Sequence, residues 1–130
     1  MKSQYELEYI IPVSPKLLFS HIATEEGLAK WFADKVYIKN KTITFVWSNS
    51  QHNAIILGYK DCKYLKFSWQ EDIDENNGCF IEFSILSISN GSETLFKITD
   101  FSEVSEQEDN VVLWNCNIEQ LKRSIGVANS

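Results

Sequence analysis

The end of the chain carries the pattern of one long amphipathic helix, which constrains the fold more than any other segment. Ser105 is in position to cap its start, and Glu108 three residues later would complete a capping box. Gly126 follows the last helical position, where a left-handed residue commonly ends a helix. Between these ends, apolar residues recur at three- and four-residue steps: Val111, Trp114, Ile118, Leu121 and Ile125. A helix with such a face needs an apolar surface to lie on.

The segments before this helix supply that surface, because they alternate between apolar and polar residues as strands do. The pattern predicts seven strands, at Tyr5–Ile11, Val36–Ile38, Ile43–Trp47, Ala54–Tyr59, Tyr64–Gln70, Cys79–Ile88 and Thr94–Phe101. Two short helices are expected after the first strand, capped by Ser14 before Pro15 and by Thr24. An acidic loop is expected at Glu71–Gly78. Sequential hairpins make the sheet antiparallel, so the predicted class is α+β.

The size and charge of the chain restrict its class further. Its 130 residues fit one domain, residues 1–130, by the usual range of domain sizes. The net charge of −6 repels phosphate, so nucleic acid is not an expected partner. No apolar run is long enough for membrane insertion, and the N-terminus lacks the apolar core of a signal peptide. A cytoplasmic location is therefore expected.

No motif indicates a metal, a cofactor or a catalytic group. The three cysteines are far apart and form no Cys-x-x-Cys pair. His21 and His52 have no carboxylate at metal-ligand spacing. The stretch from Asp72 superficially suggests a calcium loop, but Asn77 and Phe83 occupy the positions that need Gly and Glu. The sequence therefore predicts no metal site, no cofactor and no catalytic residue.

The clearest candidate for a binding site is a stripe of large side chains on one face of the predicted sheet. Successive strands contribute Ile43, Phe45 and Trp47; Leu65, Phe67 and Trp69; Ile81, Phe83 and Ile85; and Phe96 and Ile98. The stripe is either a packed core or the lining of an apolar pocket under the helix, and both interpretations stay open. The candidate ligand-binding residues are Trp31, Phe45, Trp47, Phe67, Trp69, Phe83, Phe96, Asp100, Trp114, Ile118 and Leu121.

Asp100 is the one charged residue among these candidates. It shares its strand face with Phe96 and Ile98, which would put a carboxylate at the inner edge of the stripe. There it could anchor a polar group of a ligand or act as a general acid or base. The alternative, which we favour at this point, is that it bonds amides of the linker around Ser102 and Glu103.

Several segments together resemble a known family. They are 14–19, 24–34 and 98–103, followed by Leu113-Trp114 and by Ile118 with Leu121 three residues on. They are similar to the START-like branch of the Bet v 1 superfamily, close to proteins related to the activator of Hsp90 ATPase homologues and to a small bacterial subgroup. The resemblance covers essentially the whole chain. It implies a helix-grip fold: a curved seven-stranded antiparallel sheet, two short helices after the first strand, and a long C-terminal helix over the concave face.

The residues and the resemblance together leave three candidate functions. The leading hypothesis is a non-enzymatic binding module that holds a small apolar or aromatic molecule between the sheet and the C-terminal helix. The alternatives are a cyclase- or hydrolase-like enzyme with Asp100 as acid or base, and a chaperone-linked protein-interaction module using the acidic surface. A homodimer is also considered. The resemblance carries over no catalytic histidine, because Thr99-Asp100 stands where many relatives have one.

Overall fold

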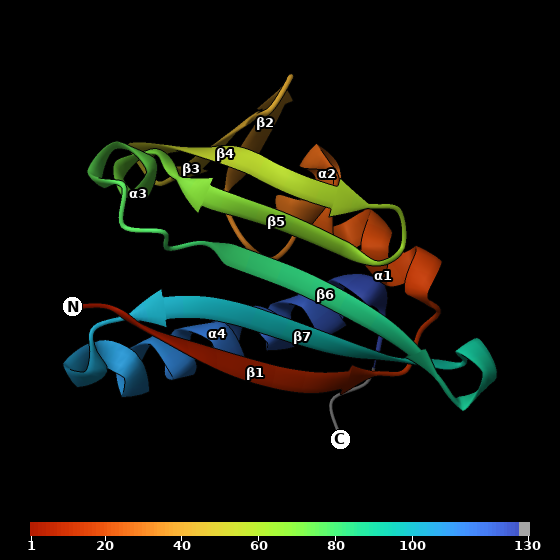
Figure 1. Cartoon of the computed structure of the whole chain (residues 1–130). Coiled ribbons are helices and arrows are strands. Elements are labelled where there is room, and N and C mark those ends of the chain that lie inside the picture. Colours follow the sequence, from red (N-terminus) through yellow and green to blue (C-terminus); the bar gives the residue numbers. More distant parts are fainter. Residues whose placement is uncertain (128–130) are drawn as a thin grey trace.

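Seven antiparallel strands form one curved sheet, and a long helix lies against it (Figure 1). The computed structural model describes residues 1–127. The elements along the chain are β1 (Ser3–Ile11), α1 (Pro15–Ile22), α2 (Glu25–Leu28), β2 (Lys35–Lys39), β3 (Thr42–Trp47), β4 (Ser50–Lys60), β5 (Tyr64–Trp69), α3 (Gln70–Glu75), β6 (Ile81–Ile88), β7 (Glu93–Ser102) and α4 (Gln107–Ile125). The strand order is β1-β7-β6-β5-β4-β3-β2, which confirms the predicted seven-stranded α+β sheet.

The two short helices begin where the sequence predicts. The Ser14 hydroxyl accepts a hydrogen bond from the backbone N–H of Leu17, at the start of α1. Thr24 caps α2 in the same way through the N–H of Gly27. Gly27 also lets the two helices approach closely, because a Cβ there would collide with the carbonyl oxygen of Ser20.

Two of the turns between strands use residues that tolerate a positive φ. Asn40, with φ 56°, joins β2 to β3, and Asn90 and Gly91, with φ 58° and 88°, lie between β6 and β7. At the end of α4, Gly126 has φ 92°, and its N–H donates to the carbonyls of Lys122 and Arg123. The predicted C-terminal cap is therefore confirmed.

Two local predictions are wrong. The expected acidic loop at Glu71–Gly78 contains helix α3, whose first turn carries Glu71 and Asp72. Negative charge there suits the positive end of the helix dipole, and Asn76 ends the helix with φ 54°.

The predicted cap of the last helix at Ser105 is also wrong. Residues Val104–Glu106 form a 3-10 turn in which the N–H of Glu106 donates to the carbonyl of Glu103. Helix α4 then begins at Gln107, and in the described structure no side chain caps it. Glu108 and Asp109 still place negative charge in its first turn.

The predicted strand faces do point inward, and they fill the space under the helix. Phe45, Phe67, Phe83 and Phe96 are fully buried, and α4 adds Trp114, Ile118 and Leu121 to the same core. Protein interiors are packed at close to crystal density. At its centre, therefore, the stripe forms a packed core.

Across residues 1–127, none of the helices combines the length and apolar character that crossing a bilayer requires.

Candidate functional site

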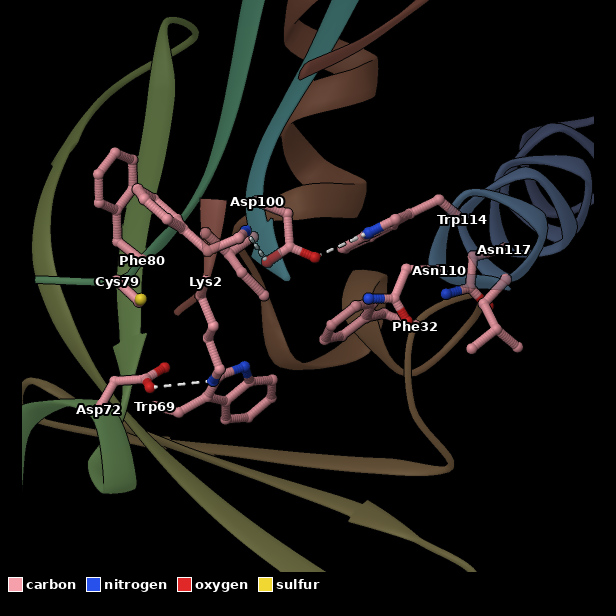
Figure 2. A pocket seen from close by; sticks show the side chains of 13 residues that line it. Lys2, Phe32, Trp69, Asp72, Cys79, Phe80, Asp100, Asn110, Trp114 and Asn117 are labelled. Atoms are coloured by element: carbon pink, nitrogen blue, oxygen red, sulfur yellow. Dashed lines mark hydrogen bonds and ion pairs between the residues drawn. The ribbon is translucent and has the colours of Figure 1, made fainter. Parts of the chain in front are cut away.

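A pocket of about 290 Å³ opens beside the core, where the first half of α4 meets the ends of several strands (Figure 2). The N-terminal segment, α3, the start of β6 and the end of β7 also contribute to its wall. The lining residues are Lys2, Phe32, Trp69, Asp72, Cys79, Phe80, Ile81, Asp100, Phe101, Asn110, Leu113, Trp114 and Asn117. The wall therefore combines aromatic rings with a few polar and charged groups.

Asp100 is fixed in this wall by three hydrogen-bond donors. Strand pairing sets Asp100 opposite Tyr5, whose hydroxyl donates to Oδ2 at 2.9 Å. The indole Nε1 of Trp114, from α4, donates to the same oxygen at 3.0 Å (Figure 2). The backbone N–H of Phe101 donates to Oδ1 at 2.8 Å. The carboxylate thus ties β1, β7 and α4 together at the edge of the pocket.

The predicted direction of Asp100 agrees with these contacts, but the favoured prediction for its partners is wrong. The carboxylate faces α4, on the side of the strand that Phe96 and Ile98 share. Its one backbone donor is the adjacent Phe101, not an amide of the linker around Ser102. The physical reason is strand parity: the side chain leaves β7 toward the helix, away from the linker.

Burial dominates the electrostatics of this carboxylate. Burial raises the pKa of Asp100 above its ordinary value, and the bonds from Phe101, Trp114 and Tyr5 offset only part of that effect. Burial also raises the pKa of Tyr5, and the neighbouring negative charge of Asp100 raises it further. The phenol is therefore held as a neutral donor to the carboxylate.

A second carboxylate lies on the opposite wall. Asp72 is 5% exposed, and its Oδ1 accepts from the Lys2 ammonium at 3.3 Å and from the Asn77 amide at 2.8 Å (Figure 2). Partial burial works to lower the pKa of Lys2, but the charge and hydrogen bond of Asp72, with smaller effects of Cys79 and Glu75, together raise it above its ordinary value. Burial raises the pKa of the nearby Cys79 thiol, which is therefore held protonated.

The structure separates the eleven candidate residues into three groups. Trp69, Asp100 and Trp114 line the pocket. Trp31 and Trp47 border a shallow hollow on the other side of Phe32, and each indole N–H donates to a backbone carbonyl. The remaining six are packed in the core with 0–2% exposure: Phe45, Phe67, Phe83, Phe96, Ile118 and Leu121.

Phe32 is the most central ring that the sequence analysis missed. It stacks on Trp114 with centroids 5.6 Å apart and an interplanar angle of 18°. It also packs against the rings of Trp31, Phe45, Trp47, Phe67 and Phe83. Its position directly after Trp31 was the available signal, because the rings of two adjacent residues leave the backbone in different directions.

Apart from Asp100, the polar residues of the lining were missed as well. Asn110, Leu113, Trp114 and Asn117 follow the i, i+3, i+4, i+7 spacing of one helix face, which could have indicated that they act together. The contact between Lys2 and Asp72 spans 70 positions and leaves no local signal. Among the described residues, no cluster of His, Cys, Asp and Glu side chains could hold a metal ion.

The curved sheet around a long C-terminal helix defines a helix-grip domain. Residues 1–127 match the model of a START-like superfamily domain, and the chain belongs to that superfamily. A comparison with curated proteins found no match.

Solved structures show the same fold. A protein from Bacteroides fragilis, solved by NMR, is 32% identical, with a TM-score of 0.67 over 99% of this chain and 95% of its own. The Aha1 dimer from Colwellia psychrerythraea is 17% identical, with a TM-score of 0.80 over 98% of this chain and 99% of its own. DynU16, a protein in the dynemicin biosynthetic locus, is 11% identical, with a TM-score of 0.75 over 92% of this chain and 46% of its own.

Proposed function

We propose that the protein is a non-enzymatic binding module that holds a small, ring-bearing molecule between the end of the sheet and the first half of α4. The observation that carries this proposal is the pocket of about 290 Å³, whose wall combines aromatic rings with the carboxylate of Asp100. Ligand sites are typically lined by apolar and aromatic side chains with a few well-placed polar groups. Because ligand pockets range over roughly 300–1,000 Å³, a ligand of this site is small.

Membership of the START-like superfamily supports the proposal, because domains of this family often bind small ligands. The site differs in position from the one that the stripe of rings suggested. Phe45, Phe67 and Phe83 occupy the centre of the sheet and leave no exposed surface there. We therefore expect the ligand beside the core, against Trp114 and Phe32.

The contacts of Asp100 favour holding a ligand over transferring a proton. Its Oδ2 already accepts two hydrogen bonds, from Tyr5 and Trp114. Oδ1 accepts from the backbone N–H of Phe101, and its remaining lone pair can accept a hydrogen bond from a ligand. A carboxylate so fixed is suited to orienting a bound group.

Two further expectations accompany the proposal. A cytoplasmic location agrees with three free cysteines, since a reducing compartment keeps thiols unpaired.

The second expectation is a homodimer, because the solved Aha1 from Colwellia psychrerythraea is a dimer. Light scattering after size-exclusion chromatography measures the oligomeric state directly.

Binding is tested by thermal shift with a panel of small ring-bearing compounds, together with native mass spectrometry of the purified protein. A ligand that binds only the folded state, at a concentration of 100 times Kd, stabilises it by about 2.7 kcal/mol. Asn110→Trp, on the pocket side of α4, would fill the site and abolish the shift. Val112→Trp, on the same helix but 60% exposed and outside the pocket, should keep it.

The outcomes are distinct. A shift that is lost in the first variant and kept in the second supports binding in this pocket. A shift of equal size in both variants would assign the ligand to another surface. No stabilising compound and no co-purified mass would refute the proposal.

A further inference from the structure

The charges on the pocket wall do not cancel. Among the described residues that line it, Asp72 and Asp100 are the two carboxylates and Lys2 is the one cation. Lys2 is committed to Asp72, with its Nζ 3.3 Å from Oδ1. Asp100 is therefore left with neutral donors alone. A partly buried carboxylate with no cation among its hydrogen-bond donors is one that a positively charged ligand would stabilise.

Asp100 has room for one more hydrogen bond. A carboxylate offers about four lone-pair sites, two on each oxygen. Oδ2 accepts from Tyr5 and Trp114, and Oδ1 accepts from the N–H of Phe101. One lone pair of Oδ1 remains for a ligand. Because Asp100 lines the pocket, a donor inside it could reach this atom (Figure 2).

The rings around Asp100 suit a cation as well. Phe32 and Trp114 line the same pocket, and the faces of aromatic rings attract ammonium groups. Elsewhere the protein already makes such a contact, since the Lys66 Nζ lies 4.2 Å from the centroid of the Phe80 ring. The net charge of −6 would in addition draw cations toward the molecule.

We propose that the pocket selects an amine: a small molecule with an apolar ring and a protonated amino group that donates to Oδ1 of Asp100. The ring packs against Phe32 and Trp114, and the amides of Asn110 and Asn117 accept or donate at the α4 side. This inference rests on the proposed binding function and adds the chemical class of the ligand.

Three probes with the same ring and spacer isolate the charge: phenethylamine, 2-phenylethanol and 3-phenylpropionate. Their Kd values are measured by NMR titration, with the Trp114 indole N–H as the reporter of the site. Both the ammonium and the hydroxyl would donate to the carboxylate, but only the ammonium adds the attraction between opposite charges, which at a partly open site is worth about tenfold in affinity. We therefore expect phenethylamine to bind about tenfold more tightly than 2-phenylethanol, and 3-phenylpropionate to bind most weakly.

Two variants move this preference in opposite directions. Asp100→Asn should abolish the advantage of the amine over the alcohol, whereas Asp61→Asn, an exposed turn residue outside the pocket, changes the net charge equally and should preserve it. Lys2→Met should strengthen amine binding severalfold, because it leaves Asp72 uncompensated, and should leave the alcohol unchanged. The ratio of two Kd values within one variant also corrects for a general loosening of the pocket.

The results separate this inference from the binding function itself. If the alcohol or the acid binds wild type as tightly as the amine, or if the preference survives Asp100→Asn, the amine assignment is wrong and the binding function stands. If the compound panel finds a ligand in the pocket but phenethylamine does not bind, the assignment is wrong again. If nothing binds in the pocket, both fail.

Discussion

The bond from Tyr5 to Asp100 offers the sharpest test of how the site is held together. Tyr5 is 7% exposed, and its hydroxyl donates to Oδ2 at 2.9 Å. Tyr5→Phe removes that donor and also the hydroxyl oxygen that accepts from Trp114 Nε1 at 3.2 Å. The ring stays, and Trp114 still donates to Oδ2 of Asp100. A hydrogen bond to a charged group contributes about 1.5–3 kcal/mol, and water from the pocket can replace part of it, so we expect a loss of about 1–2 kcal/mol at neutral pH.

The pH dependence gives this prediction a second readout. Because the pKa of Asp100 is raised in the folded protein, the native state holds its proton more tightly than the unfolded chain does. Its contribution to stability is present below the unfolded pKa, about 3.9, and is lost as the pH rises through the folded pKa. The Tyr5 bond favours the ionised form, so removing it raises the folded pKa of Asp100 further. The destabilisation by Tyr5→Phe should therefore be larger at pH 7 than near pH 4.

A matched change on the same strand serves as the control. Tyr9 donates its hydroxyl to the neutral amide of Asn115 on α4, at 2.7 Å in an exposed position. Tyr9→Phe should cost less than about 1 kcal/mol, as for a neutral bond accessible to water, with no difference between the two pH values. Urea unfolding followed by tryptophan fluorescence measures both variants. Equal losses in the two variants at both pH values would refute the role given to Asp100.

Three other perturbations test the core, a helix contact and the thiols. Phe32→Ala should reduce the free energy of unfolding by about 3–5 kcal/mol in urea titrations, since it removes a ring at the centre of the aromatic core; a loss below 1 kcal/mol would contradict that central position. Gly27→Ala should cost about 1–3 kcal/mol because its Cβ collides with the backbone of α1. Gly58→Ala meets only the side chain of Tyr64 and should cost less, so similar thermal midpoints for the two variants would count against a tight contact at Gly27. An alkylating reagent should modify exposed Cys116 well before buried Cys79, whose pKa is raised by burial, and peptide mass spectrometry that found the reverse order would show that the pocket opens.

Local chemistry made most of the fold predictable. Ser and Thr can cap a helix wherever they precede a suitable apolar pattern, as Ser14 and Thr24 do here. Asn and Gly can adopt a positive φ in any protein, as Asn40 and Gly126 do. The parity of residues along a strand is equally local, and it put Asp100 on the face of α4. Helix α3 was missed because its six residues have no apolar periodicity and depend on an Asn76 terminator.

The pocket could not be predicted from the sequence, because its shape depends on distances between residues that are far apart along the chain, which no local pattern encodes. Whether the stripe of rings encloses a cavity is decided by how Phe32 and Trp114 stack between sheet and helix, and the sequence left both outcomes open. Lys2 and Asp72 meet only because the N-terminal segment and helix α3 lie at the same end of the sheet (Figure 1). In the sequence, the stretch around Asp72 indicated only an acidic loop that lacks the Gly and Glu of a calcium site.

The order of the strands also determines when the site can exist. β1 lies at the sheet edge, and in the described structure its only strand partner is β7, so Tyr5 meets Asp100 across 95 positions. Contacts that distant in sequence form slowly, because a long loop must close first. On a ribosome, β1 emerges early and must wait for β7 while the rest of the sheet assembles. The carboxylate therefore acquires its Tyr5 donor only when the two ends of the fold have met, and a nascent chain cannot bind through this site before then.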